Sequence, residues 1–105
     1  MGSDMEYKYF LVQIQAPKED VPALIAELQK QDVIHISVAE VTNYYKLMKD
    51  DIIPFKAKAE IGEFVKKEEV KIEVKALATK IGFVLHAIAS VHSYDKPTIN
   101  VIPLI

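Results

Sequence analysis

The first thirty residues pass from strand-like alternation to helical spacing. Residues 6–15 alternate polar and apolar side chains, which predicts a strand with one fully apolar face. After Pro17 the apolar residues lie three and four positions apart, which predicts an amphipathic helix with Asp20 as its N-cap. The helix positions concerned are Val21, Leu24, Ile25 and Leu28. The chain therefore opens with a strand and a helix.

Residues 33–45 alternate again and predict a second strand, with Ile34, Ile36 and Val38 on one face. At ~3.3 Å per residue this strand spans about 43 Å, against a usual length of about 5–6 residues. We predict that no other strand of the chain can pair all of it, so that residues 42–45 pair or pack on another subunit. A protruding hairpin is the alternative.

Residues 46–69 carry the weakest pattern. Asp50, Asp51 and Pro54 interrupt it, and six lysines are interleaved with acidic residues. A connection of this length is usually functional, mobile or an extra hairpin. Whether it is such a loop or a solvated hairpin that extends the second and third strands stays open at this point.

The last third of the chain, residues 70–105, predicts a strand, a helix, a sharp corner and a strand. Residues 70–76 alternate, and residues 98–105 alternate after Pro97. Between them Thr79 is expected to cap a helix whose core stripe is Ile81, Val84, Leu85, Ile88 and Val91. Because residues 81–92 carry no formal charge, we expect a loop or a partner to cover the outer face of this helix.

This order of elements predicts an α+β protein, a ferredoxin-like βαββαβ sandwich with a long connection between its second and third strands. Two right-handed crossovers place both helices on one face of a four-stranded antiparallel sheet. Residues 5–105 are expected to form a single domain, and residues 1–4 to be a remnant of cloning. The other sheet face contains Tyr9, Leu11 and Val41 and is too apolar to be left in water, so symmetric self-association is predicted.

Composition narrows the choice of function. The formal net charge of −2 argues against broad electrostatic binding to nucleic acid. No apolar run reaches the ~18 residues of a membrane span, so a cytoplasmic location is the default expectation. The sequence contains no cysteine, which excludes disulfides and thiolate metal sites. All thirteen basic residues are lysine, so the bidentate grip of arginine on phosphates and carboxylates is missing.

The corner at residues 92–97 holds the candidate chemistry. His92 and Asp95 are the predicted metal ligands, because imidazole and carboxylate suit Cu(II) or Zn(II). Two ligands are too few for a closed site, so a neighbouring subunit, water or Glu40 would have to complete it. The structural alternative is that His92 caps the second helix at its negative end. Ser90, His92 and Asp95 match a nucleophile set by type only, since their adjacency prevents triad geometry, and no enzymatic activity is predicted.

The same corner carries a family resemblance. Residues 92–99 (HSYDKPTI) with residues 103–105 (PLI) resemble the H-P-Y-E-x-P-x-I…P-I ending of CutA, the divalent-cation tolerance family. Residues 41–46 (VTNYYK) are similar to that family's V-x-S-x-Y-x-W segment, and Lys75 takes the place of the lysine in its I-K-T strand. The resemblance implies a homotrimeric, non-enzymatic tolerance or regulatory protein that binds or responds to a divalent metal ion. The chain lacks the cysteine that CutA proteins carry before their second strand.

The first half also resembles the related PII signalling proteins. The D-x-x-A-L pattern from Asp20 and the segment VAEV at residues 38–41 parallel the PII pattern D-E-V-x-x-A-L…V-T-E-V. This resemblance implies the alternative function: a signalling protein whose loop at residues 46–67 binds a small anionic effector, such as a nucleotide, and contacts a partner protein. The effector-binding residues would be Lys46, Tyr94 and Lys96. The glycine-rich nucleotide loop of PII has no counterpart here.

Overall fold

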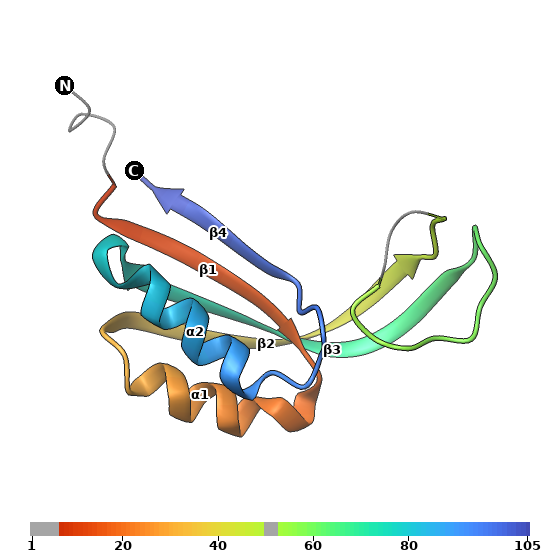
Figure 1. Cartoon of the computed structure of the whole chain (residues 1–105), viewed down its shortest axis with the longest axis horizontal. Coiled ribbons are helices and arrows are strands. Elements are labelled where there is room, and N and C mark those ends of the chain that lie inside the picture. Colours follow the sequence, from red (N-terminus) through yellow and green to blue (C-terminus); the bar gives the residue numbers. More distant parts are fainter. Residues whose placement is uncertain (1–6, 50–52) are drawn as a thin grey trace.

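The computed structural model describes residues 7–49 and 53–105. The predicted cloning remnant at residues 1–4 and the predicted interruption at Asp50 and Asp51 lie outside the described residues. Six main elements follow one another along the chain (Figure 1): β1 (Tyr9–Ala16), α1 (Val21–Gln29), β2 (Val33–Lys46), β3 (Phe64–Leu77), α2 (Ile81–Val91) and β4 (Ile99–Leu104). Short 3₁₀ turns, Lys18–Asp20 and Ala78–Lys80, lead into the two helices.

The predicted ferredoxin-like arrangement is confirmed. The four strands form one sheet in the order β2-β3-β1-β4, and each neighbouring pair is antiparallel. Both helices lie against the same face of this sheet (Figure 1). No helix in the described part of the chain is both long and apolar enough to cross a membrane.

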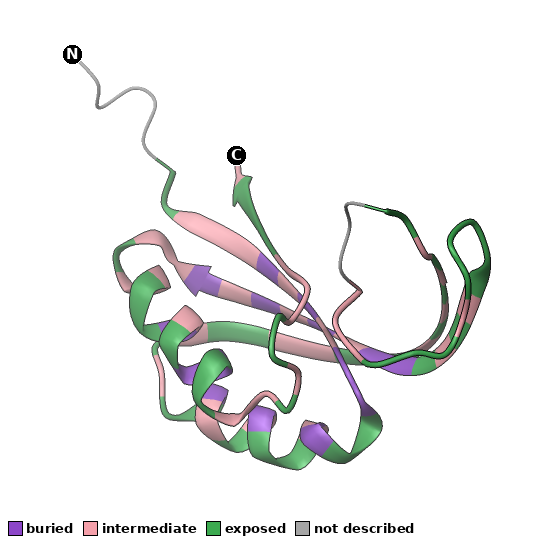
Figure 2. Ribbon diagram, turned by 45° about the vertical axis from the view of Figure 1, so that its right-hand side comes forward, coloured by how far each residue is buried: buried purple, intermediate pink, exposed green. Residues whose placement is uncertain are grey.

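The core lies between the helices and the covered face of the sheet (Figure 2). Its side chains come from alternate positions of β1 and β3 and from one stripe of each helix, as the sequence periodicity predicts. The fully or almost fully buried members are Val12, Ile14, Ala16, Leu24, Leu28, Val70, Ile72, Val74, Ala76, Val84 and Ile88. Burial of apolar surface on this scale is the main force that holds the sheet and helices together.

β2 and β3 pair along their whole length, from Val33 opposite Ala76 to Lys46 opposite Phe64. The prediction that residues 42–45 need another subunit as pairing partner is therefore wrong, and the hairpin alternative is confirmed. β3 starts at Phe64, six residues earlier than expected, because residues 64–69 form backbone pairs without an alternating apolar face. The outer part of the hairpin, residues 42–49 and 53–68, projects from the body of the molecule as an arm (Figure 1).

Three local predictions are corrected. A bulge after Val33 leaves Ile34 without a partner on β3, so that Ile34 is 54% exposed and does not share the face of Ile36. Thr79 lies within a 3₁₀ turn, and no side chain caps the start of α2. Asp20 occupies the N-cap position of α1 but makes no capping hydrogen bond, because its carboxylate binds elsewhere.

The outer face of α2 and the open face of the sheet are both partly apolar. Phe83 on α2 is 64% exposed, so no described segment of this chain provides the cover that was expected there. On the open sheet face, Tyr9 lies under the ammonium of Lys75 at 4.6 Å, and Gln13 donates a hydrogen bond to Glu73 at 2.8 Å. This sheet face is therefore more mixed in polarity than its apolar residues alone suggested.

Candidate functional site

A buried carboxylate lies where the arm joins the body. The side chain of Glu69 on β3 accepts hydrogen bonds from Asn43 and Tyr45 on β2, at 2.8 and 2.6 Å, through Oε1. Its Oε2 accepts a hydrogen bond of 2.7 Å from the hydroxyl of Tyr94 in the corner. Glu69 is only 3% exposed, and a buried charge needs such donors to offset the loss of hydration. Glu69 therefore links both strands of the arm to the corner.

The two tyrosines of this network act as hydrogen-bond donors. Burial, followed by the hydrogen bond to Glu69 and by its negative charge, raises the pKa of both Tyr45 and Tyr94 well above the ordinary tyrosine value. Both hydroxyls are consequently protonated at neutral pH. Their chemistry is that of fixed donors to Glu69 and not that of proton-transferring groups.

Phe55 adds an aromatic contact to the network. Its ring centroid lies 5.2 Å from that of Tyr45 and 5.9 Å from that of Tyr94. The ammonium of Lys67 lies 4.9 Å from the centre of the Phe55 ring, within the range of a cation–π interaction. These contacts bind the loop after β2 to the base of the arm and to the corner.

His92 has both ring nitrogens engaged within the chain. Its side chain is 1% exposed. The amide of Tyr94 donates to Nδ1 at 3.2 Å, and Nε2 lies 2.8 Å from the carbonyl oxygen of Gln15. This network assigns the proton to Nε2, because Nδ1 accepts and a carbonyl requires a donor. His92 is also the C-cap residue of α2, and its ring joins the corner to the end of β1.

Asp20 fixes the corner from the other side. Its Oδ2 accepts hydrogen bonds from the amide and the hydroxyl of Ser93, at 2.8 and 2.7 Å. The same oxygen lies 3.7 Å from Nδ1 of His92. Asp20 therefore ties the start of α1 to the residue after His92, which explains why it does not cap its own helix.

The two predicted metal ligands lie in different surroundings. The side chain of His92 is buried and both of its ring nitrogens are hydrogen-bonded, whereas Asp95 is exposed. Glu40, one of the three alternatives named to complete the site, pairs with Lys18 at 2.9 Å. Within residues 7–49 and 53–105, no three or more His, Cys, Asp or Glu side chains are grouped so that they could hold a metal ion. The described residues of one chain thus do not fit a closed metal site, and ligation by His92 and Asp95 stays a prediction that needs further ligands.

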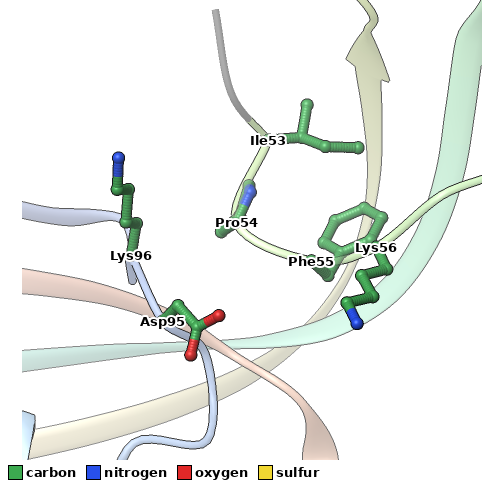
Figure 3. Close-up of a pocket in the computed structure, with 6 residues that line it drawn as sticks. All are labelled: Ile53, Pro54, Phe55, Lys56, Asp95 and Lys96. Atoms are coloured by element: carbon green, nitrogen blue, oxygen red, sulfur yellow. The ribbon is translucent and has the colours of Figure 1, made fainter.

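The three predicted residues of the alternative effector site do not line one common hollow. The Lys46 ammonium lies 6.0 Å from the ring of Phe64 in the arm. Tyr94 is bound to Glu69. Lys96 and Asp95 line an open hollow of about 220 Å³, together with Ile53, Pro54, Phe55 and Lys56 (Figure 3). Neither Lys46 nor Tyr94 lines this hollow.

Sequence reasoning missed Glu69, Asn43 and Gln15. Asn43 bridges the network by donating to the side-chain oxygen of Gln15 on β1 at 2.9 Å. The alternation of Asn43 and Tyr45 on one strand places them on one face, but their link to Glu69 depends on the register of the β2–β3 pair. That register follows from a segment without hydrophobic alternation, so the sequence held no usable signal for it.

Comparisons with known proteins identify the fold. No protein-family model matches the sequence, and no curated protein matches it. Among solved structures, the periplasmic divalent cation tolerance protein CutA from Archaeoglobus fulgidus matches with a TM-score of 0.70 at 19% identity, over 91% of this chain and 83% of that one. CutA1 from Shewanella sp. SIB1 matches with a TM-score of 0.74 at 14% identity, over 95% of this chain and 84% of that one.

A protein related to NIF3 from Bacillus cereus also matches, with a TM-score of 0.74 at 20% identity. The match covers 93% of this chain but only 26% of that one, so the chain spans about a quarter of the larger protein. The chain therefore belongs to the α+β class with a ferredoxin-like fold. More narrowly, its fold is that of the CutA proteins, whose structures it matches over most of both chains.

Proposed function

We propose that this chain is a CutA-type protein that binds or responds to a divalent metal ion, assembles as a homotrimer and catalyses no reaction. The main support is the extent of the fold match. It covers 91% of this chain and 83% of the divalent cation tolerance protein of Archaeoglobus fulgidus, so the two proteins correspond as whole domains. A cytoplasmic location stays a prediction, since that protein is described as periplasmic.

The side chains of Ser90 and His92 are both occupied by hydrogen bonds within the fold, which supports a role without catalysis. The hydroxyl of Ser90 donates to the carbonyl of Ala87, one turn back in α2, at 2.7 Å. His92 uses both ring nitrogens in hydrogen bonds that hold the corner. A catalytic serine requires a histidine that is free to take its proton, and these two residues serve the fold instead.

Asp95 and His92 are the ligands that this proposal assigns to Cu(II) or Zn(II). Asp95 is exposed and offers carboxylate oxygens to an ion in solution. His92 can contribute only if its ring releases the amide of Tyr94 or the carbonyl of Gln15. The remaining ligands would come from water or from a second copy of the chain.

The partly exposed apolar surface supports self-association. Val101 and Ile102 on the edge strand β4 are 40% and 39% exposed, and Phe83 on α2 is 64% exposed. Exposed apolar side chains of this size are common where copies of a chain meet. Light scattering at micromolar concentration is expected to give the mass of three chains, and a stable monomer would contradict this part of the proposal.

Calorimetric titration of the metal-free protein with Cu²⁺ and with Zn²⁺ tests the metal. We expect saturable binding, and we expect the metal affinity to fall at least about tenfold in Asp95→Asn. Even substitution of groups that only orient a metal ligand lowers metal affinity by about tenfold or more. Asp32→Asn is the matched control, because Asp32 is an exposed aspartate just before β2 that forms a long ion pair of 4.0 Å with Lys80. Absence of binding by either metal, or equal loss in both variants, would contradict the assignment.

A further inference from the structure

The hollow beside the corner has two walls of different origin. Figure 3 shows Ile53, Pro54, Phe55 and Lys56 of the loop on one side and Asp95 and Lys96 of the corner on the other. Its volume of about 220 Å³ lies below the roughly 300–1,000 Å³ of sites for drug-sized ligands. A ligand that fits it is the size of one amino acid and smaller than a nucleotide.

The loop wall is held in place by the network around Glu69. The ring of Phe55 packs edge-to-face against Tyr45 and at a tilt against Tyr94, and both tyrosines are hydrogen-bonded to the buried carboxylate of Glu69. Because Tyr94 immediately precedes Asp95, the same network positions both walls. The apolar wall and the backbone of the corner are therefore formed without a ligand, and a ligand needs to order only the exposed charged side chains on binding.

The lining combines an apolar surface with charges of both signs. Ile53, Pro54 and Phe55 are half-buried and offer apolar contact, whereas Lys56, Asp95 and Lys96 are exposed and charged. Within the described residues, none of these three charged groups forms an ion pair. Two ammonium groups and one carboxylate beside an apolar wall match a ligand that has a carboxylate, an ammonium and an apolar side chain.

We propose that this hollow binds a small apolar zwitterion, a free α-amino acid of the leucine or phenylalanine class. The ligand's carboxylate pairs with Lys56 or Lys96, and its ammonium pairs with Asp95. The ligand's side chain lies against the apolar wall formed by Ile53, Pro54 and Phe55. This site goes beyond the proposed metal response and does not rest on it. Exposed ion pairs are individually weak and are screened by salt, so the affinity is expected to be modest.

Titration of the whole protein with L-leucine, followed by nuclear magnetic resonance, tests the site. We expect saturable shifts of the amide resonances of Phe55, Lys56, Asp95 and Lys96 below about 20 mM ligand at low ionic strength. Isocaproate, which lacks the ammonium, and isoamylamine, which lacks the carboxylate, should each bind more weakly than leucine. The titrations contain a chelator, so that leucine binding through a metal ion at Asp95 is removed and the result is independent of the metal proposal.

Substitutions at three exposed residues distinguish the contact made by the ligand's ammonium from the contact made by its carboxylate. Asp95→Asn should weaken leucine binding roughly two- to fivefold, the effect of one exposed ion pair, and leave isocaproate unchanged. Lys96→Gln should weaken both ligands by a similar factor. Lys58→Gln is the control, since Lys58 is an exposed lysine of the same loop that does not line the hollow.

Several results would overturn the proposal. Absence of saturable shifts with both leucine and phenylalanine would reject the ligand class. Loss of isocaproate binding in Asp95→Asn would reject the pairing of Asp95 with the ammonium. Equal weakening of leucine binding in Lys58→Gln and Lys96→Gln would reject the site, because it would show only a general attraction of anions by exposed lysines.

Discussion

The body and the arm of this molecule are held together by different forces. The body, in which the two helices cover the sheet, buries a continuous apolar core. The arm, residues 42–49 and 53–68, is held at its base by directional contacts around Glu69, a carboxylate that is 3% exposed and that receives three hydrogen bonds. Apolar burial is spread over many residues, whereas the arm depends on a few groups. The candidate sites, at the corner and the hollow, lie where these two regions meet.

This difference predicts how the stability of each region responds to a substitution. Removal of one core side chain lowers the stability of the whole body in proportion to the cavity that it leaves. Removal of one member of the Glu69 network leaves several polar partners unsatisfied at once. Core variants should therefore unfold the protein as a unit, whereas network variants should loosen the arm and the corner first.

The largest expected effect is that of a core truncation. Leu28 on α1 is fully buried against the sheet, and Leu28→Ala should lower the free energy of unfolding by about 2–5 kcal/mol. Urea unfolding followed by circular dichroism measures this. Ile61→Ala is the matched control, because Ile61 lies in the arm and is 63% exposed, and it should change stability by no more than about 0.5 kcal/mol. Equal effects would contradict the division into body and arm.

The next effect is that of the buried carboxylate. Glu69→Ala leaves Asn43, Tyr45 and Tyr94 without their acceptor and should cost about 2–3 kcal/mol, as expected for hydrogen bonds to a charged group. Its neighbour Glu68 is exposed; among the described residues it accepts hydrogen bonds only from the Thr42 hydroxyl and forms an ion pair with Lys66 at 3.9 Å.

Glu68→Ala should therefore cost no more than about 0.5 kcal/mol in the same unfolding experiment. Amide exchange should also accelerate at residues 92–97 in Glu69→Ala and not in Glu68→Ala. Unchanged exchange at the corner would show that Glu69 does not link it to the arm.

The fold of the body could be predicted from the sequence because its pattern and its packing agree. The apolar positions of residues 6–15, 70–76 and 81–91 repeat with the periods of strand and helix, and the structure buries those positions. The arm was predicted only as one of two alternatives, because residues 64–69 pair with β2 through the backbone while their side chains alternate no apolar face. Backbone pairing leaves no signature in composition.

The candidate site was predictable only at the corner. The residues of the segment at 92–97 drew attention by type, yet their partners Gln15, Asp20 and Glu69 come from three distant elements. His92 shows the consequence. Its type suggests a metal ligand, whereas its burial and its two hydrogen bonds depend on the meeting of β1 with the corner.

Alkaline pH should weaken the arm through its tyrosines. Burial and then the Glu69 carboxylate raise the pKa of Tyr45 and Tyr94 above that of an unfolded tyrosine, about 10. A raised pKa in the folded state means that the stabilisation is fully present below pH ~10 and is lost as the pH rises through the folded-state pKa. Resonances of ¹³C-labelled tyrosine rings report both ionisations.

Glu69→Gln removes the negative charge and provides the comparison. Both tyrosines should ionise at lower pH in this variant than in the unchanged protein, because the charge of Glu69 no longer opposes formation of a tyrosinate. Burial is the larger cause of the raised pKa, so part of the rise should persist. Ionisation at the same pH in both proteins would contradict the role of Glu69.

The smallest effect on stability, and the sharpest on local order, is expected at Phe55. Its half-buried ring contacts Tyr45, Tyr94 and Lys67, so Phe55→Ala should lower the free energy of unfolding by less than about 1 kcal/mol, within the range of single aromatic contacts. Amide exchange at residues 53–56 should nevertheless accelerate, because these contacts hold the loop to the arm, while exchange in the core strands stays unchanged. Phe55→Leu keeps apolar contact and should restore part of the protection. If exchange accelerated equally in β1, the loop would be part of the body's cooperative unit, and the distinction between the two regions would fail at this point.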